Sequence, residues 1–167
     1  MKHILLCAAV LFAGLPCLAQ NNSPSEAEID ELVHKADEKV TGFEKALQVA
    51  KPFLPEEKFR NDTDVASTAH LLIHDVNKYG PSAYRLVALI ITLDDVVINA
   101  GQHSQGILKD GLQSVAAGKA LGTGPLSAVL LLNNAAAGCN DISELIGHAT
   151  LRLISVEEKA LLAAPAK

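Results

Sequence analysis

Histidines and carboxylates spaced to share one face of a helix are the residues of this chain best suited to chemistry. His70 and His74 lie four residues apart, the spacing that places two imidazoles side by side for a metal ion. In a helix through them, both rings would point about 140–180° away from the apolar stripe that includes Val65, Leu72 and Val76. We therefore expect an exposed pair, with a surface metal site completed by a neighbouring molecule as the alternative.

A Glu-x-x-His motif at Glu31 and His34 is typical of di-iron helical bundles. Those proteins use two such motifs and two further glutamates, all facing inward. Here the motif occurs once, and both residues would face away from the stripe that contains Ile29 and Val40. The sequence therefore gives no di-iron site.

Two further acidic sets have structural explanations. Asp141, Glu144 and His148 fall at i, i+3 and i+7, which would suit a metal or an acid–base trio, but Asp141 and Glu144 also form the capping box of a helix that restarts there. Asp94 and Asp95 diverge by about 100° on a helix, so at most one of them faces the interior. We expect Asp94 to pair with a basic residue of a neighbouring helix and Asp95 to face solvent.

Motifs for covalent or phosphate chemistry are missing: the sequence has no Gly-x-Ser-x-Gly, no His-Glu-x-x-His and no phosphate loop. Cys139 follows three alanines and a glycine, which indicates a small buried filler, although a disulfide between two copies stays open. We predict no catalytic residue, no metal site and no cofactor.

A polar belt is the strongest candidate binding site. If the last two helical regions form a hairpin about residues 118–124, Gly101 and Gly138 lie about 25 and 20 Å from the turn, at nearly the same height. Around these two points we predict a site for a small polar ligand, formed by Gln102, His103, Asn133, Asn134, Asn140 and Asp141. The alternative is a pair of facing helix breaks whose side chains satisfy freed backbone groups.

Apolar residues at helical spacing divide the chain into four helical regions. The first runs from a cap at Ser23 to about Ala50, where prolines end it. The second covers about 63–79 and follows a start signal at residues 61–64, with a short turn at 56–60 before it. The third covers 82–117, and the fourth runs from Pro125 to about Ala163.

Short connections between these regions favour antiparallel neighbours, so we predict an all-α, up-down helical bundle. The third region should be the most buried, because Ile91 and Ile98 widen an apolar stripe that continues through Leu108 and Val115. Glycines at 101, 106 and 111 and the segment 138–141 weaken the last two regions, so six shorter helices are the alternative to four long ones.

The first 19 residues have the pattern of a secretory signal peptide: a basic start, an apolar run from Ile4 to Leu15 and small residues before a cut after Ala19. The run is shorter than the roughly 20 residues of a membrane span, and no later segment is apolar enough over that length. Lipid attachment at Cys17 is the alternative. We expect residues 20–163 to form one domain of an exported protein, periplasmic or secreted, and residues 164–167 to fray.

The formal charge of the chain is −5, and only 4% of its residues are aromatic, with no Trp. These features argue against surfaces for nucleic acid, anionic membranes and sugars. The sequence therefore predicts a non-catalytic binding or interaction module whose ligand is a small molecule or a protein. A metal-binding protein that uses histidines and carboxylates on helix faces is the alternative, and the oligomeric state stays open.

Overall fold

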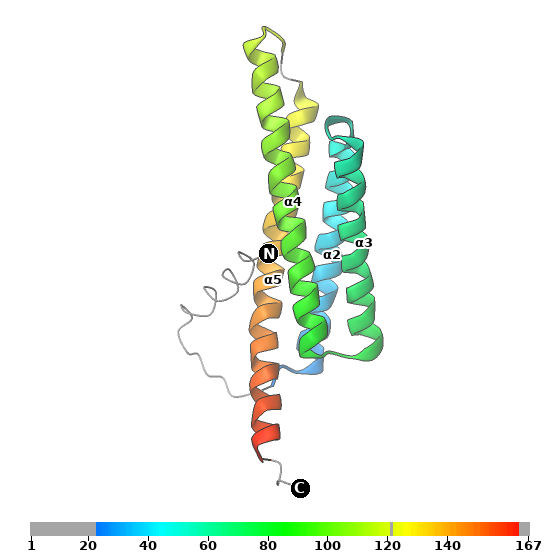
Figure 1. Ribbon diagram of the computed structural model, residues 1–167, viewed down its shortest axis with the longest axis vertical. Coiled ribbons are helices and arrows are strands. Elements are labelled where there is room, and N and C mark those ends of the chain that lie inside the picture. Colours follow the sequence, from blue (N-terminus) through cyan, green and yellow to red (C-terminus); the bar gives the residue numbers. More distant parts are fainter. Residues whose placement is uncertain (1–22, 121, 164–167) are drawn as a thin grey trace.

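The computed structural model describes residues 23–120 and 122–163. Within these ranges the chain forms four long α-helices and one short 3₁₀ helix: α2 (Glu26–Ala50), η1 (Lys51–Phe53), α3 (Glu56–Tyr79), α4 (Ala83–Ala116) and α5 (Thr123–Ala163). Figure 1 shows the four long helices running up and down beside one another, which confirms the predicted all-α bundle. The predicted signal peptide (1–19), the alternative lipid site at Cys17 and the tail at 164–167 lie outside the described residues.

The helices form a ring in which α4 packs against α3 and α5, and α2 packs against the same two helices from the other side. The core between them consists of apolar side chains that recur every three or four residues on each helix. Its largest fully buried side chains include Phe43, Leu47, Leu86, Leu89, Leu93, Leu132 and Ile146. Burial of each such side chain stabilises the fold by about 1.5–3 kcal/mol, which exceeds the cost of a single poor helix former.

Serine side chains cap two of the helices. The N-cap of α2 is Ser25, whose hydroxyl accepts a hydrogen bond from the backbone N–H of Glu28 at 3.1 Å. The prediction of a cap at Ser23 is therefore wrong by two residues, because the residue with the extended backbone just before the first helical turn is Ser25. At the start of α4, Ser82 accepts in the same way from the N–H of Arg85 at 3.3 Å.

Helix α3 begins at Glu56, seven residues before the predicted start. Pro55 takes the cap position with an extended backbone, and two glutamates occupy the first turn, where the helix dipole favours negative charge. The predicted turn at 56–60 and the predicted start signal at 61–64 are therefore wrong, and both segments lie inside the helix. One consequence is that Asp62, read from the sequence as part of a cap, is a buried helix-interior residue.

Two tight connections make neighbouring helices antiparallel. Gly80 ends α3 with φ at +78°, a conformation that favours glycine, and the Arg85 guanidinium donates hydrogen bonds to the carbonyls of Tyr79 and Gly80 at 3.3 and 3.1 Å. Gly118 has the same φ of +78° in the connection from α4 to α5. The predicted turns at 80–82 and around 118–124 are thus close to the observed ones.

Helices α4 and α5 are continuous over 34 and 41 residues, so four long helices are present in the described ranges rather than six short ones. The predicted breaks at Gly101 and at residues 138–141 are wrong. Ser143 on α5 donates a hydrogen bond of 2.8 Å to Asp94 on α4, which fixes the register of the two helices. With that register, Gly101 and Gly138 lie within about one helical turn of each other along the axis.

Figure 1 shows that α4 and the beginning of α5 continue past the connection between α2 and α3. The α4–α5 hairpin therefore projects beyond the four-helix part of the bundle at this end. At the opposite end of the bundle, Arg152 on α5 pairs with Glu28 in the first turn of α2. None of the helices in the described ranges has the length and apolar character needed to cross a membrane.

Candidate functional site

The residues of the predicted polar belt do not converge on one pocket. Five of them have exposed side chains on the outer surfaces of α4 and α5: Gln102, Asn133, Asn134, Asn140 and Asp141. The sixth, His103, is only 5% exposed and faces the interior. Continuous helices explain this separation, because without helix breaks no backbone groups are freed for these side chains to satisfy. Binding of a small polar ligand by these residues stays a prediction.

His103 pairs with Asp62, which lies on α3 and is equally buried. The contact joins His103 Nε2 to Asp62 Oδ2, and neither atom has another hydrogen-bond partner in the part of the chain that the structure describes. A buried carboxylate is costly unless a positive or hydrogen-bonding group compensates it. Each residue therefore depends on the other, and the pair ties α3 to α4 inside the bundle. The sequence pattern did not reveal this contact, because Asp62 resembled a helix cap.

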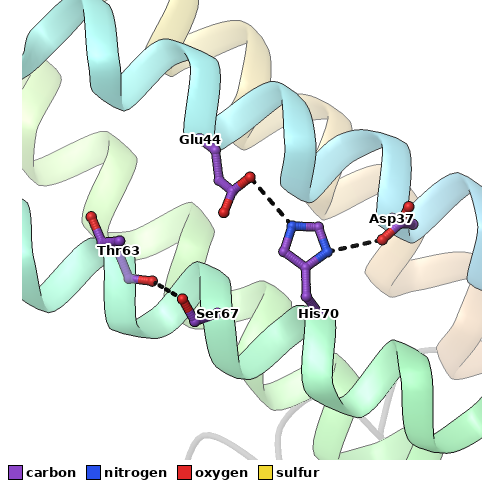
Figure 2. Close-up of polar contacts among 5 residues, drawn as sticks. All are labelled: Asp37, Glu44, Thr63, Ser67 and His70. Atoms are coloured by element: carbon purple, nitrogen blue, oxygen red, sulfur yellow. Dashed lines mark hydrogen bonds and ion pairs between the residues drawn. The ribbon is translucent and has the colours of Figure 1, made fainter.

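A second histidine contact joins α2 to α3 near the surface (Figure 2). His70 points from α3 toward α2, where its Nδ1 lies 2.9 Å from Asp37 and its Nε2 lies 3.4 Å from Glu44. One carboxylate thus faces each ring nitrogen, and the imidazole bridges two acidic residues of α2. The prediction that His70 faces away from the bundle is wrong. The buried face of α3 runs through Ala66, Ala69 and Ile73, and His70 lies at the edge of that face, turned toward α2.

The other sequence candidates lie on the surface in small local contacts. His74 is exposed and lies 3.6 Å from Asp75 on its own helix, so it does not join His70. Glu31 accepts a hydrogen bond from Lys35 at 2.6 Å, and this bond holds the pKa of the Glu31 carboxyl below its ordinary value. His34 lies 3.6 Å from its neighbour Glu38.

Asp141, Glu144 and His148 are all exposed along continuous α5. The predicted capping box is therefore wrong, because no helix begins at Asp141. In the described ranges, no three residues of the types His, Cys, Asp and Glu come together in a way that could hold a metal ion.

Cys139 is fully buried between α5 and the rest of the core, as predicted for a small apolar filler. Burial raises the pKa of its thiol to about 11, against the opposing effect of the nearby Lys39 ammonium. A thiol in this environment is a poor nucleophile and a poor metal ligand at neutral pH, because both roles need the thiolate.

An open cleft lies where the projecting hairpin meets the α2–α3 connection. It has a volume of about 270 Å³, and its lining includes Phe53, Ile107, Asp110, Ser114 and Pro125. The lining is mostly small or apolar, and its ionisable member is Asp110. None of the histidine–carboxylate contacts opens into this cleft, so it does not combine a cavity with acid–base chemistry.

The most extensive unusual surface is a row of large apolar side chains along the outside of α4. We define the α4 ridge as Tyr84, Val87, Ile91, Ile98, Leu108, Leu112 and Val115, all of which are exposed. The prediction that α4 is the most buried helix, with Ile91, Ile98, Leu108 and Val115 turned inward, is wrong for these four residues. The side of α4 that faces the core carries other residues, which include Leu86, Leu89, Leu93 and Val96.

The sequence carried a signal for this ridge. Tyr84, Ile91, Ile98 and Leu112 are separated by seven residues or multiples of seven, and so are Val87, Leu108 and Val115. A repeat of seven with two apolar positions is typical of a helix that packs along a second helix. The wide apolar face of this region was therefore two separate stripes, one for the core and one for the surface.

Comparisons of the chain with protein-family models, with curated proteins and with solved structures find no match.

Proposed function

We propose that this protein is an exported, non-catalytic interaction module, and that the α4 ridge is the surface through which it binds. The observation that carries the proposal is the ridge itself. Exposed fractions in it reach 85% for Tyr84, 57% for Ile91 and 67% for Leu112. A row of such side chains on one helix is unfavourable in water, and contiguous apolar surfaces of this kind mark sites of contact with other molecules.

The placement of the ionisable residues supports the same proposal. The Asp62–His103 pair is enclosed in the core, and the His70 contact ties two helices together at the surface. An acid–base or nucleophilic site would need such groups to face a cavity that also admits a substrate. The described cleft has one ionisable lining residue, so these histidines serve the fold in this proposal.

A photo-cross-linking amino acid placed on the ridge tests the proposal in cells that produce the protein. Substitution at Ile91 is expected to give a specific cross-linked product on illumination. The matched control is the same amino acid at Leu71, which is 66% exposed on α3 and lies outside the ridge. Absence of a product at position 91, or equal products at both positions, would overturn the proposal.

Two measurements on the purified protein test the remaining parts. Elemental analysis that finds stoichiometric zinc, copper or iron would replace this function by metal binding. The intact mass of the protein recovered outside the cytoplasm is expected to correspond to a chain that begins at Gln20, and a mass that retains the first 19 residues would contradict export by signal cleavage.

A further inference from the structure

The α4 ridge has a regular pattern that indicates what covers it. Every large exposed apolar residue of α4 lies at one of two positions of a seven-residue repeat. The first position comprises residues 84, 91, 98, 105 and 112, and the second comprises residues 87, 94, 101, 108 and 115. The repeat extends for about 47 Å along the helix. Three of its ten positions are not large and apolar: Asp94, Gly101 and Gln105. A surface with this repeat fits the side of another helix.

The order of residues along the ridge is complementary to itself when it is read backwards. In an antiparallel pair of identical helices, the two repeat positions face each other, which here joins residues whose numbers add up to 199. The facing pairs are Tyr84 with Val115, Val87 with Leu112, Ile91 with Leu108, Asp94 with Gln105, and Ile98 with Gly101. Each large apolar residue thus meets an apolar residue or a glycine, and the two polar residues meet each other.

The three exceptions to the apolar pattern strengthen this pairing. Asp94 already accepts a hydrogen bond from Ser143, and a carboxylate has further lone pairs with which to accept one from the Gln105 amide. At Gly101, a Cβ atom would meet nothing within 4 Å. This free space beside the backbone can accommodate the Ile98 side chain of a second copy.

Charge distinguishes the antiparallel from the parallel arrangement. A parallel pair would place Asp94 against Asp94 and Asp95 close to Asp95, and like charges at such positions repel. The antiparallel pair brings the half of α4 that carries Asp95 against the half that carries Lys109, which occupies the equivalent flanking position. A two-fold axis between residues 98 and 101 satisfies these relations in both directions, as an interface between identical surfaces requires.

We propose that the ligand of the α4 ridge is a second copy of this chain, and that the two copies pair through their α4 helices in antiparallel orientation. This inference rests on the proposed function, because it names the partner of the surface assigned there. The two claims have different consequences. A different protein bound to the ridge would leave the proposed function intact but would contradict the self-pairing.

Sedimentation equilibrium of the purified protein tests the pairing directly. The protein is expected to be dimeric, and Ile98→Glu, next to the two-fold axis, is expected to raise the dimer dissociation constant by at least about 100-fold. The matched control is Leu71→Glu, which puts the same charge on an exposed leucine of α3 and should leave the dimer unchanged. Circular dichroism and thermal unfolding establish that both variants keep the helical fold.

Cysteine cross-linking tests the orientation. The double variant Ile91→Cys, Leu108→Cys is expected to give a covalent dimer on oxidation, with a disulfide that joins position 91 to position 108. Ile91→Cys alone should not form one, because the two copies of position 91 lie about 25 Å apart along the axis of an antiparallel pair. A disulfide between two copies of position 91 would overturn the antiparallel arrangement.

A protein that stays monomeric up to about 1 mM, or a dimer that Ile98→Glu leaves intact, would overturn the self-pairing. The photo-cross-linking at position 91 then separates the two claims. A cross-linked product with a different protein would retain the proposed function, and no product at all would remove both.

Discussion

Asp62 and His103 illustrate how a single pair of residues controls the interior of this bundle. Both are buried, they come from different helices, and they contact each other. Loss of one partner would leave the other without compensation in the core, which typically costs about 3–5 kcal/mol. The exposed belt residues have no comparable role, because water satisfies their polar groups.

We therefore predict a large loss of stability for one variant of the predicted belt and almost none for another. His103→Ala is expected to lower the free energy of unfolding by about 3–5 kcal/mol, whereas Asn133→Leu, at an exposed position, should change it by less than about 0.5 kcal/mol. Chemical denaturation measures both. The double variant Asp62→Leu, His103→Leu should recover at least half of the loss, because it removes the polar groups together. A similar loss in the Asn133 and His103 variants would contradict this assignment.

Cys139 gives a second prediction, through its raised pKa of about 11. Because the folded state holds the thiol proton more tightly than the unfolded chain, this group contributes stability below about pH 9 that is lost as the pH rises through 11. Relative to Cys139→Ala, the wild type should therefore lose about 2–3 kcal/mol of unfolding free energy between these pH values. A constant difference between the two proteins over this range would show that the thiol is not buried as described.

The same burial makes Cys139 slow to react. At pH 8, an alkylating reagent should modify it only as fast as the protein opens, while the urea-unfolded chain reacts at the rate of a free thiol. Rapid alkylation of the folded protein would contradict the position of Cys139 in the core.

At the level of helices, the sequence predicted which segments are helical better than it predicted where each helix begins and ends. The apolar stripes of α2, α3 and α5 followed the helical repeat, and the glycines at 80 and 118 marked real turns. The start of α3 was missed because residues 61–64 resemble a cap, whereas the proline at 55 and two glutamates begin the helix earlier. A local start signal cannot distinguish a helix that begins from one that is already under way.

Helix breaks were overpredicted for a related reason. A helical glycine costs about 1 kcal/mol relative to alanine, but core residues on both sides of Gly101 and Gly138 stay buried only when α4 and α5 continue. The free energy gained by packing several helical turns against the core therefore exceeds the cost of the glycines. The sequence showed the preference, while the packing partners became known only with the fold.

Three alanine substitutions test the continuity of these helices. A Cβ at Gly106 in α4 or at Gly147 in α5 would meet nothing within 4 Å, so Gly106→Ala and Gly147→Ala should each raise the free energy of unfolding by about 0.5–1 kcal/mol. Gly118→Ala should lower it by about 1 kcal/mol or more, because φ is +78° there. Destabilisation by the first two substitutions, measured by thermal unfolding, would contradict uninterrupted helices.

For the whole molecule, the sequence predicted the fold class but not which surface is exposed. The third helical region contained two apolar stripes, and both were assigned to the core. One stripe, which includes Leu86 and Leu93, is buried, and the other forms the α4 ridge. A single chain does not reveal which stripe its own neighbours cover. The seven-residue spacing of the second stripe does not by itself distinguish the two, because the core stripe also has a regular repeat. Only the fold shows which stripe the other helices of the chain cover.

The ridge connects the fold to the proposed activity of the protein. A monomer would leave Tyr84, Ile91, Ile98 and Leu112 in contact with water at exposed fractions of 54–85%. Antiparallel pairing of α4 with α4 of a second copy removes these side chains from water together.

Oxidative footprinting of the purified protein at low and high concentration tests this claim most directly, because it measures the exposure of each side chain. We predict that oxidation of Tyr84, Ile91 and Leu112 falls several-fold as the protein concentration rises, while oxidation of Leu71, a side chain of similar exposure on α3, stays constant. If the oxidation rate of the ridge residues does not change with protein concentration, as expected for Leu71, the α4 ridge is not the contact between two copies.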